Sequence, residues 1–592
     1  MELEAELDSL RAARKAAAVS SLPFANRPVG SPSSAPAVKA DEARGCRVFV
    51  RDLSQAVLPD SEPRPGEAAG VLEAFASPGQ YETLTFAVKP LRDLGDVRVR
   101  VSDLSAGWRR AWQGGIPASS VEVGVGRYLE CLTGEAGYNY QVLPRVVQPR
   151  DPMPLRGDMT VRWWLRVHVP EGTAPGDYQG AVRVETEKGP GFSLPLRLRV
   201  LPIQLEPVPI PAGLYHFDYV YWYTHFWQRT FGDDPWLRAR VLEHERQNMQ
   251  MLRRYGINSL SMTGEDLRNE ARYDGDQLKI RDDGPFSQWM DLCASAGMKA
   301  MPWYGFESVG GTCLPSGNYG RKVAQFSPEW ERDFVSVAHW VKQQEKARGW
   351  PEVILTTSDE LSNDGATGAE RGVKTLQAIN RGRGDRPWRT LASVNGPYER
   401  ALVPLVSIIM PNHAYPITGE TLAEIHRQKT ELWLYNVGTS RATWGFYPWA
   451  IGARGRFQWF NCQIRGDPWN SFGCDSAYTI TRTTPGEPLP SPELFEISEG
   501  LNDLRYLATL EKRIAEAAAS TKGMAREAAA AAQKELDDLR RSIPVDARTL
   551  IGQVDAASAG VATKGEWANH ALLNQKRLLI AEAILRLQKS MK

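Results

Sequence analysis

The sequence predicts a multidomain protein of β and α/β class: an N-terminal β-sandwich, then a (β/α)8 barrel of the TIM type, then a helical C-terminal appendage. Short runs with period-two alternation fill the stretch from Cys46 to about Leu205, which is typical of an antiparallel sandwich. After Pro211, apolar strand-like runs alternate with helical stretches, which favours a (β/α)8 barrel. Beyond about residue 490 the pattern is helical.

These changes of pattern define four expected segments. They are 1–45, a short helix and a Pro- and Ser-rich linker; 46–207, the β-sandwich domain; 208–515, the barrel; and 516–592, a C-terminal helical extension. We expect the helical extension to pack on the barrel or to form a homo-oligomer contact between copies of the chain.

The barrel prediction depends on strand candidates that alternate with helices. The candidate strands are 213–219, 257–262, 299–306, 353–360, 390–395, 406–412, 431–437 and 456–464. The candidate helices are 234–254, 284–297, 328–347, 368–381 and 418–429. An open doubly wound sheet is the alternative. No G-x-G-x-x-G or P-loop follows any of these strands, which disfavours a nucleotide-binding sheet.

Composition narrows the function classes. The 592 residues carry a formal net charge of +1, which gives no electrostatic reason to expect nucleic acid as a partner. No segment reaches the ~20 apolar residues of a membrane span. The cysteines form no C-x-x-C pair and the histidines lack zinc-finger spacing, so we expect no metal site and no cofactor.

The opening stretch MELEAELDSLRAARKAAAVSS lacks the apolar core of a signal peptide. A cytoplasmic protein is expected to begin in this way. A secreted or periplasmic protein would do so if its signal or an upstream domain lay outside this sequence, so the compartment stays open.

Catalytic groups of a (β/α)8 barrel lie at the carboxyl ends of its strands. Here those ends carry carboxylates, amides, imidazoles and aromatic rings but few cations, a set that suits a neutral polyhydroxylated ligand better than a phosphate. For each aromatic ring or histidine, packing in the barrel interior is an equally good expectation. The candidate substrate-binding residues are His216, Asp218, Trp303, Tyr304, Asn395, His413, Tyr435, Asn436, Trp459 and Asn461, and Asn412 lies at one of the same strand ends.

Two adjacent carboxylates, Asp359 and Glu360, end the fourth strand candidate in VILTTSDELSNDG. Most glycosidases use two carboxylates that face each other across the bond, about 5–5.5 Å apart for retention and ~6.5–9.5 Å apart for inversion. Neighbouring residues have Cα atoms ~3.8 Å apart and, on a strand, opposite side-chain directions. The pair is therefore poorly placed to straddle a glycosidic bond.

A different division of labour fits neighbouring carboxylates. Glu360 protonates the departing oxygen, and Asp359 orients a 2-acetamido group whose carbonyl oxygen attacks the anomeric carbon. Substrate-assisted enzymes of this kind are exceptions to the two-carboxylate rule. Two like charges in one cleft raise one pKa, which would keep a proton available for Glu360 to donate near neutral pH.

The SDE at the end of this strand resembles the catalytic Asp-Glu pair of glycoside hydrolase family 123. Two further stretches are similar to that family and to its relatives of unassigned function, namely LWLYNVGTSRATWGFYPWAIGARGRFQWFNCQIRGDPW at 432–469 and ELFEISEGLNDLRYLATLEKRI at 493–514. The segment VPEGTAPGDYQGAVRVE resembles the module that precedes the barrel there. The resemblance covers roughly residues 70 to 515. It departs from the family at Asn461-Cys462-Gln463, where relatives often carry Trp-Ala with an Asn, so the contacts that select the sugar are expected to differ.

The resemblance implies a retaining, exo-acting β-N-acetylgalactosaminidase in which Asp359 orients the acetamido group and Glu360 is general acid and base. The expected partner is a glycan or glycoconjugate that ends in β-linked N-acetylgalactosamine or a related 2-acetamido hexose. Two alternatives stay open. One is a glycosidase for a sugar without an acetamido group, with Asp467 or another carboxylate as the nucleophile. The other is a non-catalytic carbohydrate-binding protein.

Overall fold

The computed structural model describes residues 38–106, 114–133, 139–157, 159–216, 234–262, 267, 270–304, 324, 326–459, 461, 481–482, 488–550 and 565–592. The expected N-terminal helix and most of the linker lie outside these residues. The chain divides into two units, Met1–Gln204 with Trp469–Ala477, and Leu205–Pro468 with Tyr478–Lys592. Each unit is described below by itself.

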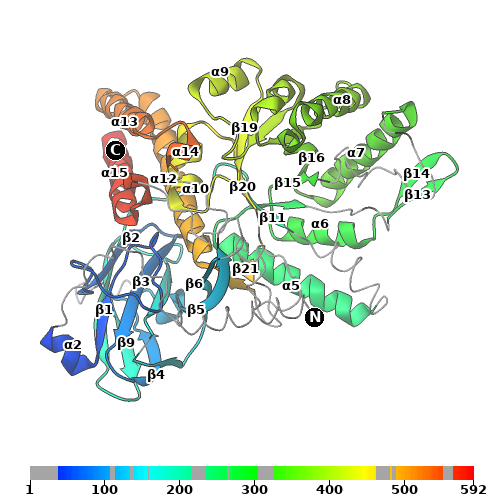
Figure 1. Ribbon diagram of the computed structural model, residues 1–592. Helices are drawn as coiled ribbons and strands as arrows, with labels where there is room; N and C mark the ends of the chain where they lie inside the picture. The colour runs from blue at the N-terminus through cyan, green and yellow to red at the C-terminus, as the bar shows by residue number, and fades with distance from the viewer. Residues whose placement is uncertain are drawn as a thin grey trace, which may run out of the picture. The chain divides into compact units, whose positions relative to one another are not determined.

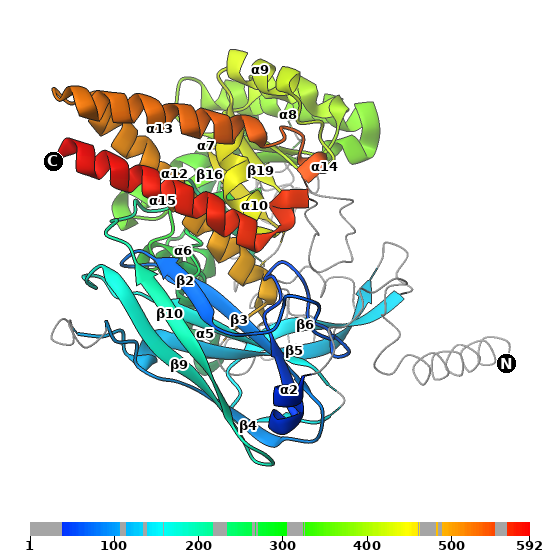
Figure 2. The ribbon, with the colours of Figure 1, turned by 90° about the vertical axis from the view of Figure 1, so that its left-hand side faces the viewer.

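The first unit contains two five-stranded sheets, with strand orders β1-β3-β8-β5-β6 and β2-β10-β9-β4-β7. The first sheet is antiparallel throughout, and the second is antiparallel except for the parallel pair of β2 with β10. Strands β9 and β10 run side by side in Figure 2. The elements are α2 Lys39–Arg44, β1 Cys46–Phe49, β2 Leu72–Ala76, β3 Tyr81–Pro90, β4 Gly95–Val101, η2 Ala118–Ser120, β5 Val121–Thr133, β6 Asn139–Gln148, β7 Met153–Leu155, β8 Val161–His168, β9 Gly176–Thr186 and β10 Phe192–Val200.

The two sheets contribute to one hydrophobic cluster. In β10 the leucines at alternate positions are buried and the residues between them are exposed, as expected when one face of a strand packs on a core. Leu196 and Leu198 of this strand lie in the same cluster as Phe86 and Trp163 of the other sheet, whose rings stack at 5.5 Å. The sheets lie within residues 46–207, where the β-sandwich stays a prediction.

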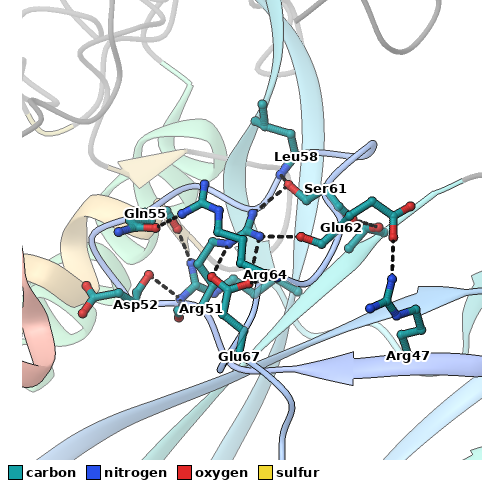
Figure 3. A network of polar contacts seen from close by, with 11 residues as sticks. Arg47, Arg51, Asp52, Gln55, Leu58, Ser61, Glu62, Arg64 and Glu67 are labelled. Atoms are coloured by element: carbon teal, nitrogen blue, oxygen red, sulfur yellow. Dashed lines mark hydrogen bonds and ion pairs between the residues drawn. The ribbon is translucent and has the colours of Figure 1, made fainter. Parts of the chain in front are cut away.

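The segment between β1 and β2 is fastened by buried arginines (Figure 3). Arg51 pairs with Glu67 at 3.0 Å and donates hydrogen bonds to the Ser61 hydroxyl and the Glu62 carbonyl. Arg162 of β8 donates to the backbone carbonyl of Arg51 at 2.8 Å. These bonds fix an irregular segment onto the strands of the first sheet, because each of its carbonyls would otherwise lack a partner when buried.

The second unit contains a closed parallel barrel with the strand order β11-β12-β15-β16-β17-β18-β19-β20. Pairing of β20 with β11 closes the ring. The predicted barrel is therefore confirmed, and the alternative of an open doubly wound sheet is wrong. The strands are β11 Ala212–His216, β12 Ser259–Met262, β15 Ala300–Trp303, β16 Glu352–Asp359, β17 Thr390–Val394, β18 Ile408–Pro411, β19 Glu431–Tyr435 and β20 Gly455–Gln458.

Helices connect the strands, and α6, α7, α8 and α9 follow one another around the outside of the strands in Figure 1. Local signals set their ends. Asp234 and Ser327 accept backbone N–H bonds as N-caps, each with Pro in the first turn, and Gly349 ends its helix in the left-handed conformation. The helices are α5 Pro235–Arg254, α6 Pro285–Ser295, α7 Pro328–Arg348, α8 Gly365–Arg383, α9 Gly419–Arg427, α10 Arg441–Trp444 and α11 Phe446–Ala450.

Three connecting pieces complete the described barrel. A hairpin of β13 Ala271–Asp274 and β14 Gln277–Ile280 precedes α6, and the short 3-10 segment η5 Leu361–Asp364 follows β16. Strands β17 and β18 are joined by the 3-10 segment η6 Pro397–Leu405, which contains Pro404. Proline removes a backbone donor, which disfavours a regular α-helix at this point.

The C-terminal helices pack on the barrel through α10. Helix α12 contacts α10, α13 and α15, and these C-terminal helices lie side by side in Figures 1 and 2. None of the described helices is long and apolar enough to cross a membrane. The elements are β21 Thr481–Arg482, β22 Leu489–Pro490, α12 Pro492–Ala518, α13 Gly523–Ser542, α14 Ala547–Leu550, η8 Gly565–Ala568 and α15 His570–Met591.

A buried ion network joins these helices to the barrel. Asp503 of α12 accepts hydrogen bonds from Arg441 Nε at 2.7 Å and Arg577 Nε at 2.5 Å. Arg577 also pairs with Glu499 at 2.9 Å, and all of these side chains are 0–1% exposed. The network ties α15 to the connection between β19 and β20, in agreement with one of the two expectations for this segment. A contact between copies of the chain stays a prediction.

Candidate active site

Asp359 and Glu360 lie at the carboxyl end of β16, but the strand does not run to them regularly. The register between β16 and β17 shifts between Thr356 and Ser358, which marks a β-bulge. Glu360 then takes a left-handed conformation with φ 48° and ψ 42°, which non-glycine residues adopt rarely. The strict alternation of side chains that the sequence argument used therefore does not extend to this pair.

One carboxylate oxygen of Glu360 accepts hydrogen bonds from two neighbouring side chains. Asn412 Nδ2 donates to Glu360 Oε1 at 2.9 Å, and the Tyr435 hydroxyl donates to the same oxygen at 2.6 Å. The Asn412 amide is itself oriented, because its Oδ1 accepts the backbone N–H of Ala414. Among the described residues both hydrogen bonds to this carboxyl arrive at Oε1, so Oε2 is the oxygen that can exchange a proton with a ligand.

Asp359 is backed by a row of hydroxyl groups. Ser393 lies opposite Asp359 in the β16–β17 register and forms a side-chain hydrogen bond with that carboxyl. The Tyr304 hydroxyl bonds to Ser393 Oγ at 2.5 Å, and the Tyr215 hydroxyl bonds to Tyr304. If each hydroxyl donates toward the next, the row ends on an ionised Asp359.

The surroundings raise the pKa of Asp359 to about 7, first because protein around the carboxyl removes hydration and second because Glu360 is negative, while the bond from Ser393 lowers it. Solvent nevertheless reaches the Asp359 side chain. Solvent on that side offsets part of the lost hydration, so the surrounding protein and the neighbouring Glu360 charge together give the pKa its upward direction.

Because the two carboxyls interact, their titration belongs to the pair. The pair binds one proton as the pH falls through about 7. That Glu360 holds this proton stays a prediction, and burial of Asp359 works against it in the absence of a ligand. The reason is local: the protein strips hydration from Asp359 more strongly than its one hydroxyl partner compensates.

Tyr435 contacts Glu360 and lies in the electric field of both carboxylates. Its hydroxyl bonds to Glu360, and burial together with the negative charges of Asp359 and Glu360 holds the pKa of Tyr435 far above its usual range. The ring belongs to the barrel core, 6.0 Å from the ring of Tyr215. Both carboxylates come from the end of one strand, and Glu360 is the one that contacts this tyrosine.

The next strand ends add further candidate residues to this cluster. His413 Nδ1 faces the backbone carbonyl of Asn436 at 2.9 Å, so that nitrogen carries a proton and the neutral ring presents Nε2 as an acceptor. The Asn436 side chain accepts the backbone N–H of Trp459. The Trp459 ring lies 5.6 Å from the ring of Tyr215 and is half-buried.

Three predicted substrate-binding residues lie in packed surroundings. His216 is fully buried, with Nε2 2.7 Å from Glu245 and Nδ1 2.9 Å from the Asn461 amide. Asn461 is fully buried as well and accepts a bond from Thr481. Trp303 is fully buried against the ring of Phe286. The polar groups of His216 and Asn461 bond to other protein groups. For His216 and Trp303 the structure therefore agrees with packing in the barrel interior, the alternative to substrate binding.

The remaining predicted residues are placed as follows. Asn395 is half-buried and donates to Asn363 Oδ1 at 2.7 Å, which links the segments after β17 and β16. Asp218 and Asp467 lie outside the described residues. No group of three or more histidine, cysteine or acidic side chains suited to a metal ion occurs in the described part of the chain.

Three residues of the site escaped the sequence analysis. Tyr215 and Ser393 sit at inward-facing positions of short buried strands, and a hydroxyl at such a position is the signal that could have found them. Glu399 is fully buried beside the carboxylate pair and raises the pKa of Asp359 through its charge. Nothing in the surrounding sequence PYERALV distinguishes it from a solvated surface glutamate.

Comparison with known proteins bears mainly on the fold. No protein-family model matches the sequence, and no curated protein matches it. Among solved structures, the chain is similar to a family 123 glycoside hydrolase from Clostridium perfringens, whose structure was analysed for glycolipid glycan hydrolysis. The alignment has 10% identity and a TM-score of 0.65, and it covers 92% of this chain and 98% of that chain. The resemblance to family 123 is thus confirmed at the level of the fold.

Other glycoside hydrolases align much less well. A family 2 β-galacturonidase from Eisenbergiella tayi gives 12% identity and a TM-score of 0.27 over 78% of this chain and 87% of that chain. A family 5 xyloglucanase from Bacteroides ovatus gives 8% identity and a TM-score of 0.25 over 73% of this chain and 98% of that chain. At such scores these two alignments carry no argument.

Proposed function

We propose that this protein is a retaining glycoside hydrolase that releases a terminal β-linked 2-acetamido hexose, with N-acetylgalactosamine as the leading sugar. The observation that carries the proposal is the position of Asp359 and Glu360, consecutive residues at the carboxyl end of one barrel strand, where the Tyr435 hydroxyl holds Glu360. Two carboxylates on one wall suit a reaction whose nucleophile comes from the substrate. The family 123 fold of the neighbour supports the same assignment.

In the first step, Glu360 donates its proton to the glycosidic oxygen as the bond between that oxygen and the anomeric carbon breaks. The acetamido carbonyl oxygen forms the new bond to the anomeric carbon, which gives an oxazolinium intermediate. Asp359 accepts the amide N–H and stabilises the positive charge that develops there. That hydrogen bond favours ionised Asp359, so substrate binding moves the proton of the pair onto Glu360.

In the second step, Glu360 acts as a base and takes a proton from a water molecule that attacks the anomeric carbon. The bond between that carbon and the acetamido oxygen breaks, and the acetamido group is restored. Two displacements at one carbon retain the β configuration. Asn412 and Tyr435 keep Oε1 of Glu360 in place through both steps, so that Oε2 handles the proton.

Residues around the pair would recognise the sugar. The Nε2 of His413 can accept a hydroxyl hydrogen bond from the ring, and the half-buried Trp459 offers an aromatic face to its apolar side. The polar groups of Tyr304 and Asn436 serve the site indirectly, because they are bonded to Ser393 and Trp459. The identity of the sugar and of the group attached to it belongs to this proposal.

Aryl glycosides test the proposal directly. The wild-type protein is assayed with aryl β-glycosides of N-acetylgalactosamine, N-acetylglucosamine and galactose, and with analogues in which fluorine replaces hydrogens of the N-acetyl methyl group. Fluorination weakens the carbonyl oxygen as a nucleophile, so rates should fall steeply along that series. Rates that are indifferent to fluorination would favour a protein carboxylate as the nucleophile. Binding of these sugars without turnover would favour a carbohydrate-binding protein.

A further inference from the structure

A third carboxylate, Glu399, lies behind the catalytic pair and holds backbone from two strand ends. Its Oε1 accepts the backbone N–H of Leu361 at 2.7 Å. Its Oε2 accepts the N–H groups of Asn395 at 2.8 Å and Gly396 at 3.2 Å. The side chain is fully buried, so these amides take the place of the water that a carboxylate would otherwise bind.

Two of these three bonds have a local explanation. Glu399 is the third residue of η6, and a glutamate there closes a capping box with the amides that precede the helix. The bond to Leu361 has no such origin, because Leu361 follows β16 and lies 38 positions away. A glutamate that only capped η6 would leave one carboxylate oxygen free for solvent. Here that oxygen holds the residue next to Glu360.

The turn at Glu360 needs such support. A φ of 48° is unfavourable for a side chain with a Cβ, and such conformations persist where the surroundings enforce them. Two backbone bonds flank the turn, from Glu360 N to the Ser393 carbonyl at 3.1 Å and from Asn363 N to the Glu360 carbonyl at 3.0 Å. The bond from Leu361 N to Glu399 Oε1 is a side-chain bond to the backbone directly after Glu360.

The segments that follow β16 and β17 are also closely packed against each other. A Cβ added at Gly396 would lie 2.7 Å from both Cβ and Oγ of Ser362, closer than real side chains approach. The glycine therefore permits the distance at which one carboxylate can reach both Leu361 and Asn395.

We propose that Glu399 is a positioning residue of the active site: its buried carboxylate locks the backbone turn at Glu360 and so directs the side chains of Asp359 and Glu360 toward the ligand. The effect on turnover rests on the function proposed above. The effect on the turn does not. The negative charge of Glu399 also acts on Asp359, together with Glu360 and the Ser393 hydroxyl.

Glu399→Gln is the first test. Glutamine has the same shape, but its NH2 group cannot accept a hydrogen bond. Either the bond to Leu361 or the bonds to Asn395 and Gly396 are therefore lost. We expect kcat/KM to fall about 10- to 100-fold, because a displacement approaching 1 Å has a cost of that size. Loss of the negative charge lowers the pKa of Asp359, so the alkaline limb of the pH profile, where the pair loses its proton, should move to lower pH.

Two variants separate position from charge. Gly396→Ala keeps the charge of Glu399 but pushes the two segments apart, so kcat/KM should fall while the alkaline limb stays where it is. Glu420→Gln removes an exposed carboxylate that pairs with Arg400 of η6, and it should leave both quantities unchanged. A purely structural role for Glu399 would lower the amount of folded enzyme in Glu399→Gln and Gly396→Ala and leave kcat/KM per folded enzyme unchanged.

A crystal structure of Glu399→Gln gives a readout that is independent of turnover. The proposal expects a changed φ at Glu360 and a displaced η5. A positive φ with an unmoved η5, or wild-type kcat/KM in both Glu399→Gln and Gly396→Ala, would overturn it. If Glu399→Gln does not fold, Gly396→Ala carries the kinetic test. If the wild-type protein hydrolyses no 2-acetamido glycoside, the proposed function fails, and the crystal structures still decide whether Glu399 holds the turn.

Discussion

Replacement of Tyr435 by phenylalanine is a sharp test of how Glu360 works. The change removes one hydroxyl and leaves the ring, which is 2% exposed and packed in the barrel core. What is lost is a 2.6 Å hydrogen bond to Glu360 Oε1. A hydrogen bond to a charged group contributes about 1.5–3 kcal/mol, which corresponds to roughly 10- to 150-fold in rate. Because Asn412 still donates to the same oxygen, we expect the lower part of this range, about 10- to 50-fold in kcat/KM.

The assay is a series of aryl 2-acetamido glycosides whose leaving groups differ in basicity. With Tyr435→Phe the Glu360 carboxyl can turn away from the departing oxygen, so substrates with poor leaving groups should lose the most. Substrates with good leaving groups need little protonation and should be almost unaffected.

Tyr447→Phe is the matched control. Tyr447 is also fully buried, but it lies on α11 and not at a barrel strand end. Its hydroxyl donates to the Val545 carbonyl at 2.9 Å. That variant should keep the wild-type kcat/KM for every substrate. An equal loss for good and poor leaving groups in Tyr435→Phe, or the same loss in Tyr447→Phe, would refute the assignment of Glu360 as an acid held by Tyr435.

Three further variants follow from the same contacts. Ser393→Ala removes a donor that lowers the pKa of Asp359. Because solvent reaches Asp359 on one side, water replaces part of the lost bond. The alkaline limb of kcat/KM should therefore rise by about 0.5–1 pH unit, and an unmoved limb would contradict the contact. Asp359→Asn should raise the melting temperature at pH 8 but scarcely at pH 4. The folded pKa near 7 lies above the unfolded value, so the wild-type protein loses stability as the pH rises between them; equal shifts at both pH values would show the sign to be wrong. Arg577→Met leaves Asp503 and Glu499 short of a buried cation and should cost about 3–5 kcal/mol in urea unfolding, against ~0–1 kcal/mol for the exposed Arg586→Met. Similar losses in the two arginine variants would mean that the buried network is not stabilising.

The barrel strands could be predicted from the sequence because parallel strands buried on both faces are runs of apolar residues. The stretch VILTTSD is such a run, and its abrupt end in two charges coincides with the end of β16 at Asp359. The order of the strands then followed from the alternation with helices.

The course of the chain at the pair could not be predicted. The bulge before Ser358 depends on the register of β16 against β17, which is set by packing and not by the local sequence. The left-handed turn at Glu360 depends on Glu399, which lies in another loop. Strict alternation of side chains along one strand therefore does not apply to Asp359 and Glu360.

Single polar residues at strand ends were the least predictable. His216 and Asn461 match the composition of a sugar site as well as His413 does, yet the first two bond to each other inside the protein. The distinction lies in Glu245, an acidic partner on α5 that is 2.7 Å from His216. Pairings of this kind join segments far apart in the sequence, and neither segment reveals them alone.

The arginine that ties α15 to Asp503 also has a consequence for synthesis of the protein. On the ribosome, every barrel strand emerges before residue 577 does. Until then, Asp503 can pair only with Arg441, and Glu499 lacks Arg577, the cation that accompanies its burial in the finished protein. Docking of α12 against the connection that leads into β20, the last strand of the ring, is therefore completed only when translation of α15 is finished. A premature stop codon before that helix would preserve all barrel strands and both proposed catalytic carboxylates, but it would leave Glu499 of α12 without Arg577 and so destabilise the chain.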